Sequence, residues 1–452
     1  MTDTPSAVII LAAGKGTRMK STKAKILHEI AGRPMVLHAL DAVDSLEPQK
    51  KIVVVSPDMD EVTRVVVGED DTVEIVVQPK TLGTGHAVQC AGEALADFIG
   101  NIIVLFGDTP LMTAQTLQRF NELMQSHDVG VIGFRADDPT GYGRLIQDGD
   151  GNIIAIREHK DASAEERDID FCNSGVVGMA AKDFPSLIEA LSNDNANGEY
   201  YLTDVIEIAA SLGLKVGAIE CNEEEVLGVN TQAQLSNAET IYQNRARARA
   251  MENGVQMIAP ATVYFSYDTV IKSDVLIEPN VVFGPGVYVS SGATIRAFCH
   301  IEGALIGKNS IVGPYARLRP GTVLSDAVKV GNFVEIKNAE ISTGAKVNHL
   351  SYVGDAKVGA GANIGAGTIT CNYDGFNKHL TEIGEGAFIG SNSALVAPVR
   401  IGEGAYVGSG SVITKDVNQN ALAVGRGKQK NIDGWAKIYR SKNVKNKKTA
   451  KD

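Results

Sequence analysis

The sequence has 452 residues, of which 44% are hydrophobic and 21% charged, the composition of an ordinary globular protein. This length predicts two or three domains. The formal net charge of −11 argues against a general nucleic-acid binder. No apolar run approaches the ~18 residues that a membrane span requires. The start of the chain also lacks the features of a signal peptide, so we expect no membrane partner.

The charges are unevenly distributed along the chain. Residues 426–452 contain ten Lys and Arg against two Asp, a net charge of +8, which leaves −19 on residues 1–425. We expect this last segment to be a solvated basic tail, with contact to an anionic ligand as the alternative. The cysteines show no CxxC pair, which predicts reduced thiols in a cytoplasmic protein. They are Cys90, Cys172, Cys221, Cys299 and Cys371.

Residues 1–231 alternate apolar strand candidates with helical patterns, the latter for example at 85–98 and 113–125. This alternation predicts a mostly parallel α/β sheet that binds its ligands at the carboxyl ends of the strands. The strand candidates are residues 7–11, 51–55, 73–77, 101–106 and 130–134.

Residues 232–253 are rich in Ala, Arg and Gln and predict one helix that connects two halves of the chain. Beyond it, aliphatic or aromatic residues recur every six positions, with occasional slips of one residue. This hexapeptide period predicts a parallel β-helix in which each recurring side chain points into a triangular prism. The recurring residues are Ile271, Ile277, Phe283, Val289, Ile295, Ile301, Ile306, Val312, Leu318, Leu324, Val330, Ile336, Ile341, Val347, Val353, Val358, Ile364, Ile383, Ile389, Leu395, Ile401, Val407 and Ile413.

The expected domains are therefore residues 1–231 and 254–425, joined by the helix 232–253 and followed by the tail 426–452. Residues 371–382 interrupt the six-residue count. A β-helix tolerates an insertion only as a loop on its outside, and such loops often carry function. A neutral insertion is the alternative.

A glycine-rich loop follows the first strand candidate, with the sequence LAAGKGTRM at residues 11–19. Small residues let backbone N–H groups approach a phosphate, and the start of a following helix favours an anion. The spacing matches neither the Walker A motif nor the full dinucleotide fingerprint. Arg18 and Lys25 could neutralise a triphosphate bound to this loop, and ordinary solvated charge is the alternative.

Asp108 follows the strand candidate 101–106. A carboxylate at the carboxyl end of a buried parallel strand suits Mg²⁺, and Asn230, after another apolar stretch, could supply a second hard oxygen. The competing interpretation is that each residue caps a helix.

These motifs resemble the sugar-1-phosphate nucleotidylyltransferases. The resemblance includes the glycine-rich loop, Lys25, QPKTLGTGHA at 78–87, GD at 107–108, TGYGR at 140–144, EHKD at 158–161, NSG at 173–175 and GEYY at 198–201. With the hexapeptide half attached, the chain from about residue 7 to residue 426 resembles a family of bifunctional bacterial enzymes. These enzymes join an N-acetylglucosamine-1-phosphate uridylyltransferase to a glucosamine-1-phosphate acetyltransferase.

The resemblance implies a Rossmann-like nucleotidyltransferase domain followed by a left-handed β-helix, with UTP and acetyl-CoA as cosubstrates and Mg²⁺ as cofactor. Leu11, Ala12, Gly14, Gln78, Gly83 and Thr84 would hold the uridine nucleotide, Lys25 and Arg18 would face its phosphates, and Asp108 and Asn230 would bind Mg²⁺. Gly143, Glu158 and Asn173 would bind N-acetylglucosamine-1-phosphate. Phe106 departs from the tyrosine that is common in these enzymes before Gly-Asp.

In the C-terminal half, Arg319, Lys337 and Tyr352 are spaced so that we expect them to line one ridge of the prism. A basic ridge suits a sugar phosphate, and unrelated surface charge is the alternative. His349 lies beside this ridge, where acyl transfer to an amine needs a base that works near neutral pH.

The resemblance assigns His349 as that base. It also assigns Arg319, Lys337, Tyr352 and Asn363 to glucosamine-1-phosphate. Ala366, Asn372, Tyr373, Ser391, Ser409 and Arg426 would contact acetyl-CoA, with Ser409 a departure from the alanine of some relatives. Hexapeptide acyltransferases usually form homotrimers, so the resemblance implies a trimer.

We therefore expect a cytoplasmic enzyme that makes UDP-N-acetylglucosamine, a precursor of peptidoglycan and lipopolysaccharide. One alternative is a nucleotidylyltransferase whose β-helix only assembles or regulates it. The other is a scaffold that is not an enzyme. A purely structural β-helix needs neither His349 nor Lys337, and a scaffold does not need the glycine-rich loop.

Overall fold

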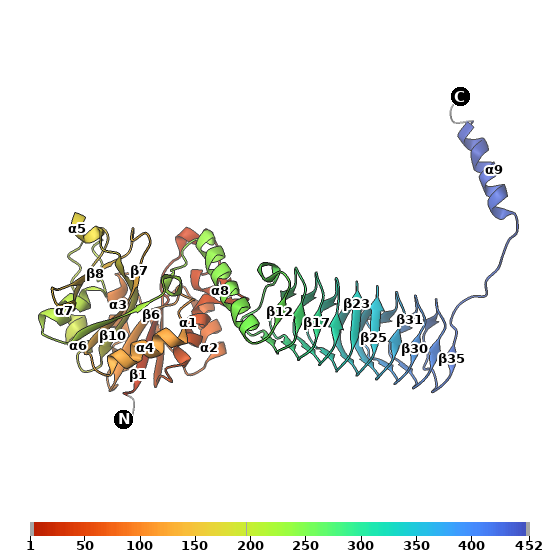
Figure 1. The fold of residues 1–452 in the computed structure, drawn as a ribbon, viewed down its shortest axis with the longest axis horizontal. Helices are drawn as coiled ribbons and strands as arrows, with labels where there is room; N and C mark the ends of the chain where they lie inside the picture. Colours follow the sequence, from red (N-terminus) through yellow and green to blue (C-terminus); the bar gives the residue numbers. More distant parts are fainter. Residues whose placement is uncertain (1–3, 196, 449–452) are drawn as a thin grey trace. The chain divides into compact units, whose positions relative to one another are not determined.

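The computed structural model describes residues 4–195 and 197–448. The chain divides into two compact units, one of Met1–Arg249 with Tyr264–Tyr267 and one of Ala250–Val263 with Asp268–Asp452 (Figure 1). Among the described residues, no helix combines the length and the apolar character needed to cross a membrane.

The N-terminal unit is built on a twisted sheet with the strand order β11-β7-β10-β6-β1-β4-β5. All neighbours pair in parallel except β10, which runs antiparallel to both β6 and β7. The predicted strands are confirmed, whereas β10 and the hairpin β8–β9 beside it were not predicted. The strands are β1 (Ser6–Leu11), β4 (Lys50–Val55), β5 (Glu74–Val77), β6 (Asn101–Phe106), β7 (Val129–Arg135), β8 (Arg144–Gln147), β9 (Ile153–Arg157), β10 (Phe171–Ala180) and β11 (Val216–Cys221).

Helices cover both faces of this sheet (Figure 1). Alternate residues of β1 point to opposite sides, so Val8 and Ile10 belong to one hydrophobic core and Ala7 and Ile9 to the other. A strand that is buried on both faces has a continuous apolar sequence, as β1 does. The first core contains α1 (Met35–Asp44), α2 (Asp60–Glu69) and α4 (Ala114–Met124); the second contains α3 (Thr84–Cys90), α6 (Phe184–Glu189) and α7 (Asp204–Ser211).

The helix predicted between the halves is α8 (Gln232–Glu252). Its Ala238 and Ile241 pack in a small core with Ile30, Met35 and Val229 of the N-terminal unit. The first part of α8 is therefore integrated into that unit rather than free of it.

The C-terminal unit is a parallel β-helix of short strands from β12 (Gln256–Met257) to β35 (Leu422–Ala423). The predicted inward positions are confirmed, since each is at most 5% exposed apart from Ile271, which is half-buried at the first coil. The fold class predicted from the sequence, a nucleotidyltransferase-like α/β domain followed by a left-handed β-helix, is confirmed.

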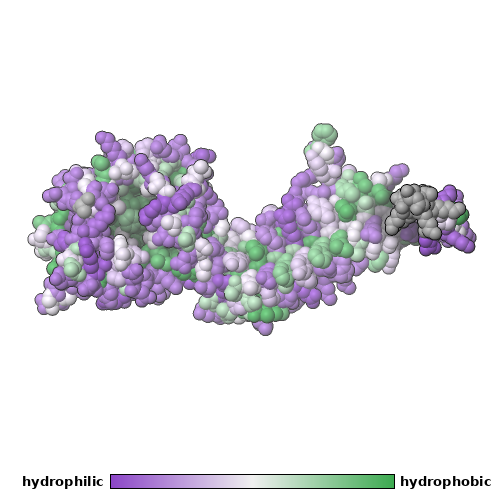
Figure 2. Space-filling view, turned by 90° about the horizontal axis from the view of Figure 1, so that it is seen from above, coloured by the Kyte–Doolittle hydropathy of each residue, from purple (hydrophilic) through white to green (hydrophobic). Residues whose placement is uncertain are grey.

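The corners of the prism need left-handed backbone, which asparagine and glycine supply at most of them. One corner instead carries Phe298, Tyr315, Phe333 and Leu350 in successive coils, all with φ between 51° and 62°. The ring centroids lie 4.7 Å and 5.2 Å apart in the two stacked pairs. We call these four residues, three aromatic and one leucine, the aromatic column. Each is about half exposed to solvent. Figure 2 shows hydrophobic patches on the surface of the β-helix.

The insertion at residues 371–382 lies between β28 (Ile369–Cys371) and β29 (Thr381–Ile383), as predicted. It folds back on itself through a bridge between Tyr373 and Lys378. The Asp374 carboxylate accepts hydrogen bonds from the Phe376 and Asn377 amides and from His379. The insertion is thus an ordered loop.

The stability of the β-helix should depend on its inward positions and not on neighbouring apolar residues outside. Leu324 in β22 (Thr322–Leu324) is 2% exposed, whereas Leu305 in β19 (Ala304–Ile306), the strand that pairs with it, is 50% exposed. Leu324→Ala should lower the free energy of unfolding of this unit by ~2–5 kcal/mol, and Leu305→Ala should change it by at most ~0.5 kcal/mol. Hydrogen exchange of the β-helix amides in the full chain measures both; equal effects would contradict the inward assignment.

Candidate active sites

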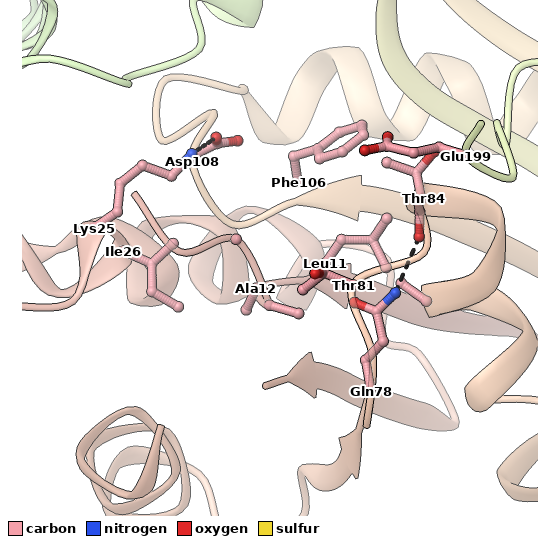
Figure 3. Close-up of a pocket in the computed structure, with 14 residues that line it drawn as sticks. Leu11, Ala12, Lys25, Ile26, Gln78, Thr81, Thr84, Phe106, Asp108 and Glu199 are labelled. Atoms are coloured by element: carbon pink, nitrogen blue, oxygen red, sulfur yellow. Dashed lines mark hydrogen bonds and ion pairs between the residues drawn. The ribbon is translucent and has the colours of Figure 1, made fainter. Parts of the chain in front are cut away.

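A pocket of about 770 Å³ opens where β1 and β6 end in the N-terminal unit. The two strands pair in register, with Leu11 opposite Phe106, so the loops that follow them start at the same edge of the sheet. Every residue predicted to hold the uridine nucleotide lines this pocket, together with Lys25 and Asp108 (Figure 3). Figure 2 shows a hollow with hydrophobic atoms at its base in the N-terminal unit.

The glycine-rich loop approaches Lys25 closely. Gly16 has φ 59°, and a Cβ atom there would lie 2.5 Å from Cβ of Lys25. The absent side chain therefore lets the Lys25 ammonium reach the pocket beside Gly14, whose Cβ would lie 3.9 Å from it.

Lys25 joins the two predicted metal ligands. Its ammonium contacts the Asp108 carboxylate and donates a hydrogen bond of 3.0 Å to Oδ1 of Asn230. Arg18 donates to the same Asn230 oxygen at 2.9 Å, although Arg18 itself is exposed outside the pocket lining. The structure thus gathers two cations and two hard oxygen ligands in one place.

The alternative roles of Asp108 and Asn230 as helix caps are taken by other residues. Thr113 caps α4, because its hydroxyl accepts a hydrogen bond from the Thr116 amide. Thr231 accepts from the Gln234 amide at the start of α8. The oxygens of Asp108 and Asn230 converge instead on the Lys25 ammonium. A Mg²⁺ site with one carboxylate and one amide ligand requires the same convergence of oxygens on a positive charge.

The pocket wall opposite Lys25 is made by two segments that are far apart in sequence. The Gly85 amide donates to the Tyr200 carbonyl, and the Tyr200 amide donates to the Leu82 carbonyl, both at 2.8 Å. Gly83 has φ 111°, and a Cβ there would lie 2.5 Å from the Tyr200 oxygen. This close approach explains why TLGTG and GEYY occur together in the predicted site.

A second pocket, of about 970 Å³, adjoins the first and shares Thr84, Phe106 and Glu199 with it. It contains the predicted sugar ligands Glu158 and Asn173. Gly143 lies behind them, since its carbonyl accepts from the Asn173 amide at 2.8 Å. Phe106 lies at the junction of the two pockets without the hydroxyl of a tyrosine.

Two carboxyl groups with raised pKa values lie close together here, Glu158 in the pocket lining and Asp204 next to it. Burial raises the pKa of the Glu158 carboxyl, which also accepts a hydrogen bond of 3.1 Å from the Thr203 hydroxyl. Burial, followed by the charges of Glu207 and Glu158, raises the pKa of Asp204 to about 6. The analysis of the sequence missed Thr203 and Asp204, because only the fold brings α7 beside Glu158.

In the C-terminal unit, Arg319 and Lys337 lie beside each other in adjacent coils, because Leu318 of β21 (Arg317–Leu318) pairs with Ile336 of β24 (Glu335–Ile341). Arg319 donates to the Glu335 carboxylate at 2.9 Å. Tyr352, which was predicted to lie on the same ridge, is not the direct register partner of Lys337 but is offset from it by two residues.

Tyr352 pairs with Glu335, and Lys337 pairs with Gly354, because this coil is longer than the spacing suggested. Tyr352 still shares a face with Lys337, since residues two apart in a strand point the same way. The Tyr352 hydroxyl lies against Gly354, and a side chain at position 354 would clash with it.

The insertion adds a cation that the analysis of the sequence missed. Close contact with Lys378 lowers the pKa of Lys337. Asn372 contacts the Asp355 carboxylate and donates to the Tyr352 hydroxyl at 3.5 Å. Burial raises the pKa of Asp355, but hydrogen bonds from Asn338 and Asn372 outweigh it and hold the pKa below its usual value. Asp355 therefore anchors the insertion beside the predicted phosphate ligands.

His349 ends β25 (Lys346–His349) and is exposed. Its Nδ1 lies 2.8 Å from Oδ1 of Asn332, its register partner in β23 (Lys329–Asn332). An amide oxygen only accepts hydrogen bonds, so Nδ1 carries the proton and Nε2 keeps a free lone pair.

Most of the residues predicted for acetyl-CoA continue from His349 along one corner. The amides of Leu350, Gly367, Asn392 and Gly410 donate to the carbonyls of Asn332, His349, Ala366 and Ser391 in turn. These bonds place five residues in successive coils, with Arg426 donating to the Ser409 carbonyl at 2.8 Å at the end. We call them the corner track: Asn332, His349, Ala366, Ser391 and Ser409. Asn363, Asn372 and Tyr373 lie outside it, in β27 (Asn363–Ile364) and in the insertion.

Three family models match the chain. They are the MobA-like NTP transferase domain at residues 8–194, the GMPPB C-terminal domain at residues 255–349, and the bacterial transferase hexapeptide (six repeats) at residues 380–415.

Curated relatives match both units. The bifunctional protein GlmU of Zymomonas mobilis subsp. mobilis is 50% identical over 444 residues, which cover 98% of this chain and 99% of that protein. The proteins of the same name from Azorhizobium caulinodans and Paramagnetospirillum magneticum are 52% and 51% identical, covering 98% and 100% of this chain and the same shares of their own. The chain therefore belongs to the family of bifunctional GlmU proteins.

Proposed function

We propose that this chain catalyses two successive reactions at separate sites. The C-terminal unit transfers the acetyl group of acetyl-CoA to glucosamine-1-phosphate. The N-terminal unit then transfers UMP from UTP to N-acetylglucosamine-1-phosphate and releases pyrophosphate. The product, UDP-N-acetylglucosamine, feeds peptidoglycan and lipopolysaccharide synthesis. The single observation that carries this proposal is that each unit has its own cluster of cationic side chains. Lys25 and Arg18 meet at Asn230 in one unit, and Arg319, Lys337 and Lys378 lie together in the other.

The arrangement of the N-terminal pockets supports uridylyl transfer. A phosphate oxygen of the sugar attacks the α-phosphorus of UTP, the bond to pyrophosphate breaks, and the electron pair leaves with the pyrophosphate. A phosphate monoester is mostly ionised at pH 7, so the attack needs no protein base. Glu158 and Asn173 orient the sugar in one pocket. Lys25 in the other pocket, with Arg18 beside it at Asn230, neutralises the phosphates.

Asp108 and Asn230 would hold Mg²⁺ in this site. When bound, the ion neutralises charge on the phosphates that builds up as pyrophosphate leaves. Lys25, which contacts both oxygens, would then turn toward the nucleotide phosphates.

The C-terminal site supports acetyl transfer. Asn332 holds the His349 ring with Nε2 free, and Nε2 takes a proton from the glucosamine amine as the amine attacks the thioester carbonyl. The C–N bond forms, the C–S bond breaks, and the electron pair leaves on the CoA sulfur. Arg319, Lys337 and Lys378 hold the sugar phosphate, while Tyr352 and Asn363 contact the sugar.

The corner track supports an extended binding site for acetyl-CoA. Successive coils are spaced ~4.8 Å apart, so the track from His349 to Ser409 matches a long, flexible cosubstrate whose thioester lies at the His349 end. Asn372 and Tyr373 flank it from the insertion. Arg426 places a cation at the far end for the CoA phosphates. A β-helix with a purely assembling role would not need this alignment.

A homotrimer would complete the acetyl-transfer site. Phe333 and Leu350 of the aromatic column directly follow Asn332 and His349 of the corner track, so His349 is bordered by an exposed apolar side chain. Covering the column with a second copy of the chain would bury these side chains and enclose the base.

The basic tail, with α9 (Trp435–Lys448), is available for anionic ligands. The cysteines are free thiols, in keeping with a cytoplasmic location.

Single substitutions should separate the two activities. Asp108→Asn removes the charge that holds Mg²⁺ and should abolish most pyrophosphate release while CoA release is unchanged. His349→Ala removes the base and should slow CoA release by ~10²–10⁴-fold without affecting pyrophosphate release. Part of the acetyl transfer should return at higher pH, where the amine loses its proton unaided. Both rates are measured on the same preparations, and a folded variant that loses both activities would refute separate sites.

Lys378→Met should weaken binding of glucosamine-1-phosphate, because it removes one of three cations around the phosphate. We expect KM for this substrate to rise ~10- to 100-fold, the effect of losing a hydrogen bond to a charged group, with a smaller change in kcat. Lys357→Met, at an exposed position of β26 (Tyr352–Val358), is the matched control. An unchanged KM for Lys378→Met would show that the insertion does not contribute to the phosphate site.

Tyr315→Lys should disrupt the trimer, since it introduces a charge into the proposed contact between copies. Light scattering should show smaller species, with acetyl transfer lost and uridylyl transfer kept. Tyr406→Lys changes another exposed, stacked tyrosine and should leave the trimer intact. An acetyltransferase that remains fully active as a monomer would show that neighbouring copies contribute nothing to the site.

A further inference from the structure

Gln78 lines the nucleotide pocket, and its amide is held in one orientation. The side chain is 4% exposed. Its Nε2 donates to the Gly83 carbonyl at 3.1 Å and lies 3.1 Å from Nδ1 of His86. Two acceptors therefore use both N–H bonds of the amide. In Figure 3 the amide nitrogen makes the dashed contact with the loop, while the amide oxygen points away from that contact.

His86 can accept this hydrogen bond only in one form of its ring. Gln78 Nε2 is a donor, so Nδ1 of His86 must carry a lone pair, and the ring proton must lie on Nε2. While the ring proton stays on Nε2, His86 opposes a flip of the Gln78 amide, because a flipped amide would bring its oxygen against Nδ1 of His86 as well as against the Gly83 carbonyl. Gly83 supplies one of these acceptors from the loop, and His86 supplies the other from the first turn of α3.

The orientation decides which base edge the pocket can read. An amide oxygen accepts a hydrogen bond from N3–H of uracil. Cytosine has a lone pair at the same ring nitrogen, so the two acceptors repel. An amide in the opposite orientation would present N–H groups and favour cytosine. Sites that pair a substrate N–H in this way reject the analogue that lacks it.

We infer that His86 is a positioning residue that fixes the Gln78 amide and thereby selects UTP over CTP. The inference rests on the proposed uridylyl transfer and on Gln78 reading the base. His86 itself lies on α3 behind Gln78 and does not line the pocket. Its effect on the nucleotide is therefore transmitted entirely through the amide.

Substitutions of His86 test this inference through the ratio of kcat/KM for UTP to that for CTP. His86→Leu removes the acceptor and should lower the ratio ~5- to 10-fold, the range expected for one hydrogen bond, with kcat/KM for CTP rising. His86→Asn places an amide oxygen where Nδ1 lies and should restore most of the ratio. His86→Gln is the matched control, since its polar group reaches the position of Nε2 instead, and it should behave like the leucine variant.

Each outcome supports or overturns the inference. Thermal unfolding of the N-terminal unit in the same preparations reports that the unit carrying His86 is folded. If the leucine and glutamine variants lose activity equally with UTP and CTP, or if the asparagine variant restores nothing, His86 has only a structural role and the inference is wrong. If wild-type protein has no activity with UTP, the proposed function fails instead.

Discussion

Parallel strands paired in register are the constraint on which both candidate sites depend. In the N-terminal unit, the pairing of Leu11 with Phe106 makes two distant loops start at one edge of the sheet, so the glycine-rich loop and Asp108 share a pocket. In the C-terminal unit, the same kind of pairing stacks one coil on the next. Residues that are 17 or more positions apart, such as Asn332 and His349, then become neighbours. A shift of one residue in either register would turn these side chains to the opposite face.

The two sites solve a related electrostatic problem in different ways. In the proposed reactions each site binds a phosphate, and each holds clustered positive charge. In the N-terminal site, Lys25 is compensated by Asp108, which leaves a mixed cluster suited to a divalent ion and a triphosphate together. In the C-terminal site, Lys337 and Lys378 lie so close that the pKa of Lys337 falls. The Asp355 charge offsets only part of this repulsion. A bound anion would relieve the rest, so we expect this site to bind a phosphate without a metal.

Much of the fold follows from local periodicity. The six-residue period gave nearly every inward side chain, because each coil repeats the same short-range geometry, and the alternation of apolar runs gave the parallel strands. The antiparallel β10 was missed, because its place between β6 and β7 is decided by tertiary pairing. The packing of α8 against Ile30 and Val229 was missed for the same reason.

The candidate sites, like the fold, contain some residues that could be predicted from the sequence and others that could not. Residues in contiguous motifs could be predicted, Gly14 from the glycine-rich loop together with the resemblance and Gln78 from the resemblance alone. Lys378, Thr203 and His86 could not, because their importance comes from a neighbour that the fold supplies. The register of Tyr352, which pairs with Glu335 and not with Lys337, could not be predicted from the repeat either, because the length of a coil changes there.

The central claim is that one chain carries both reactions and that the acetyl step supplies the uridylyl step. The most direct measurement is an incubation of purified protein with glucosamine-1-phosphate, acetyl-CoA, UTP and Mg²⁺, followed by chromatography of the products. The account predicts free CoA, pyrophosphate and UDP-N-acetylglucosamine together, and it predicts that omission of acetyl-CoA stops the formation of the nucleotide sugar. Release of only one of CoA and pyrophosphate by folded protein in the complete mixture would contradict it.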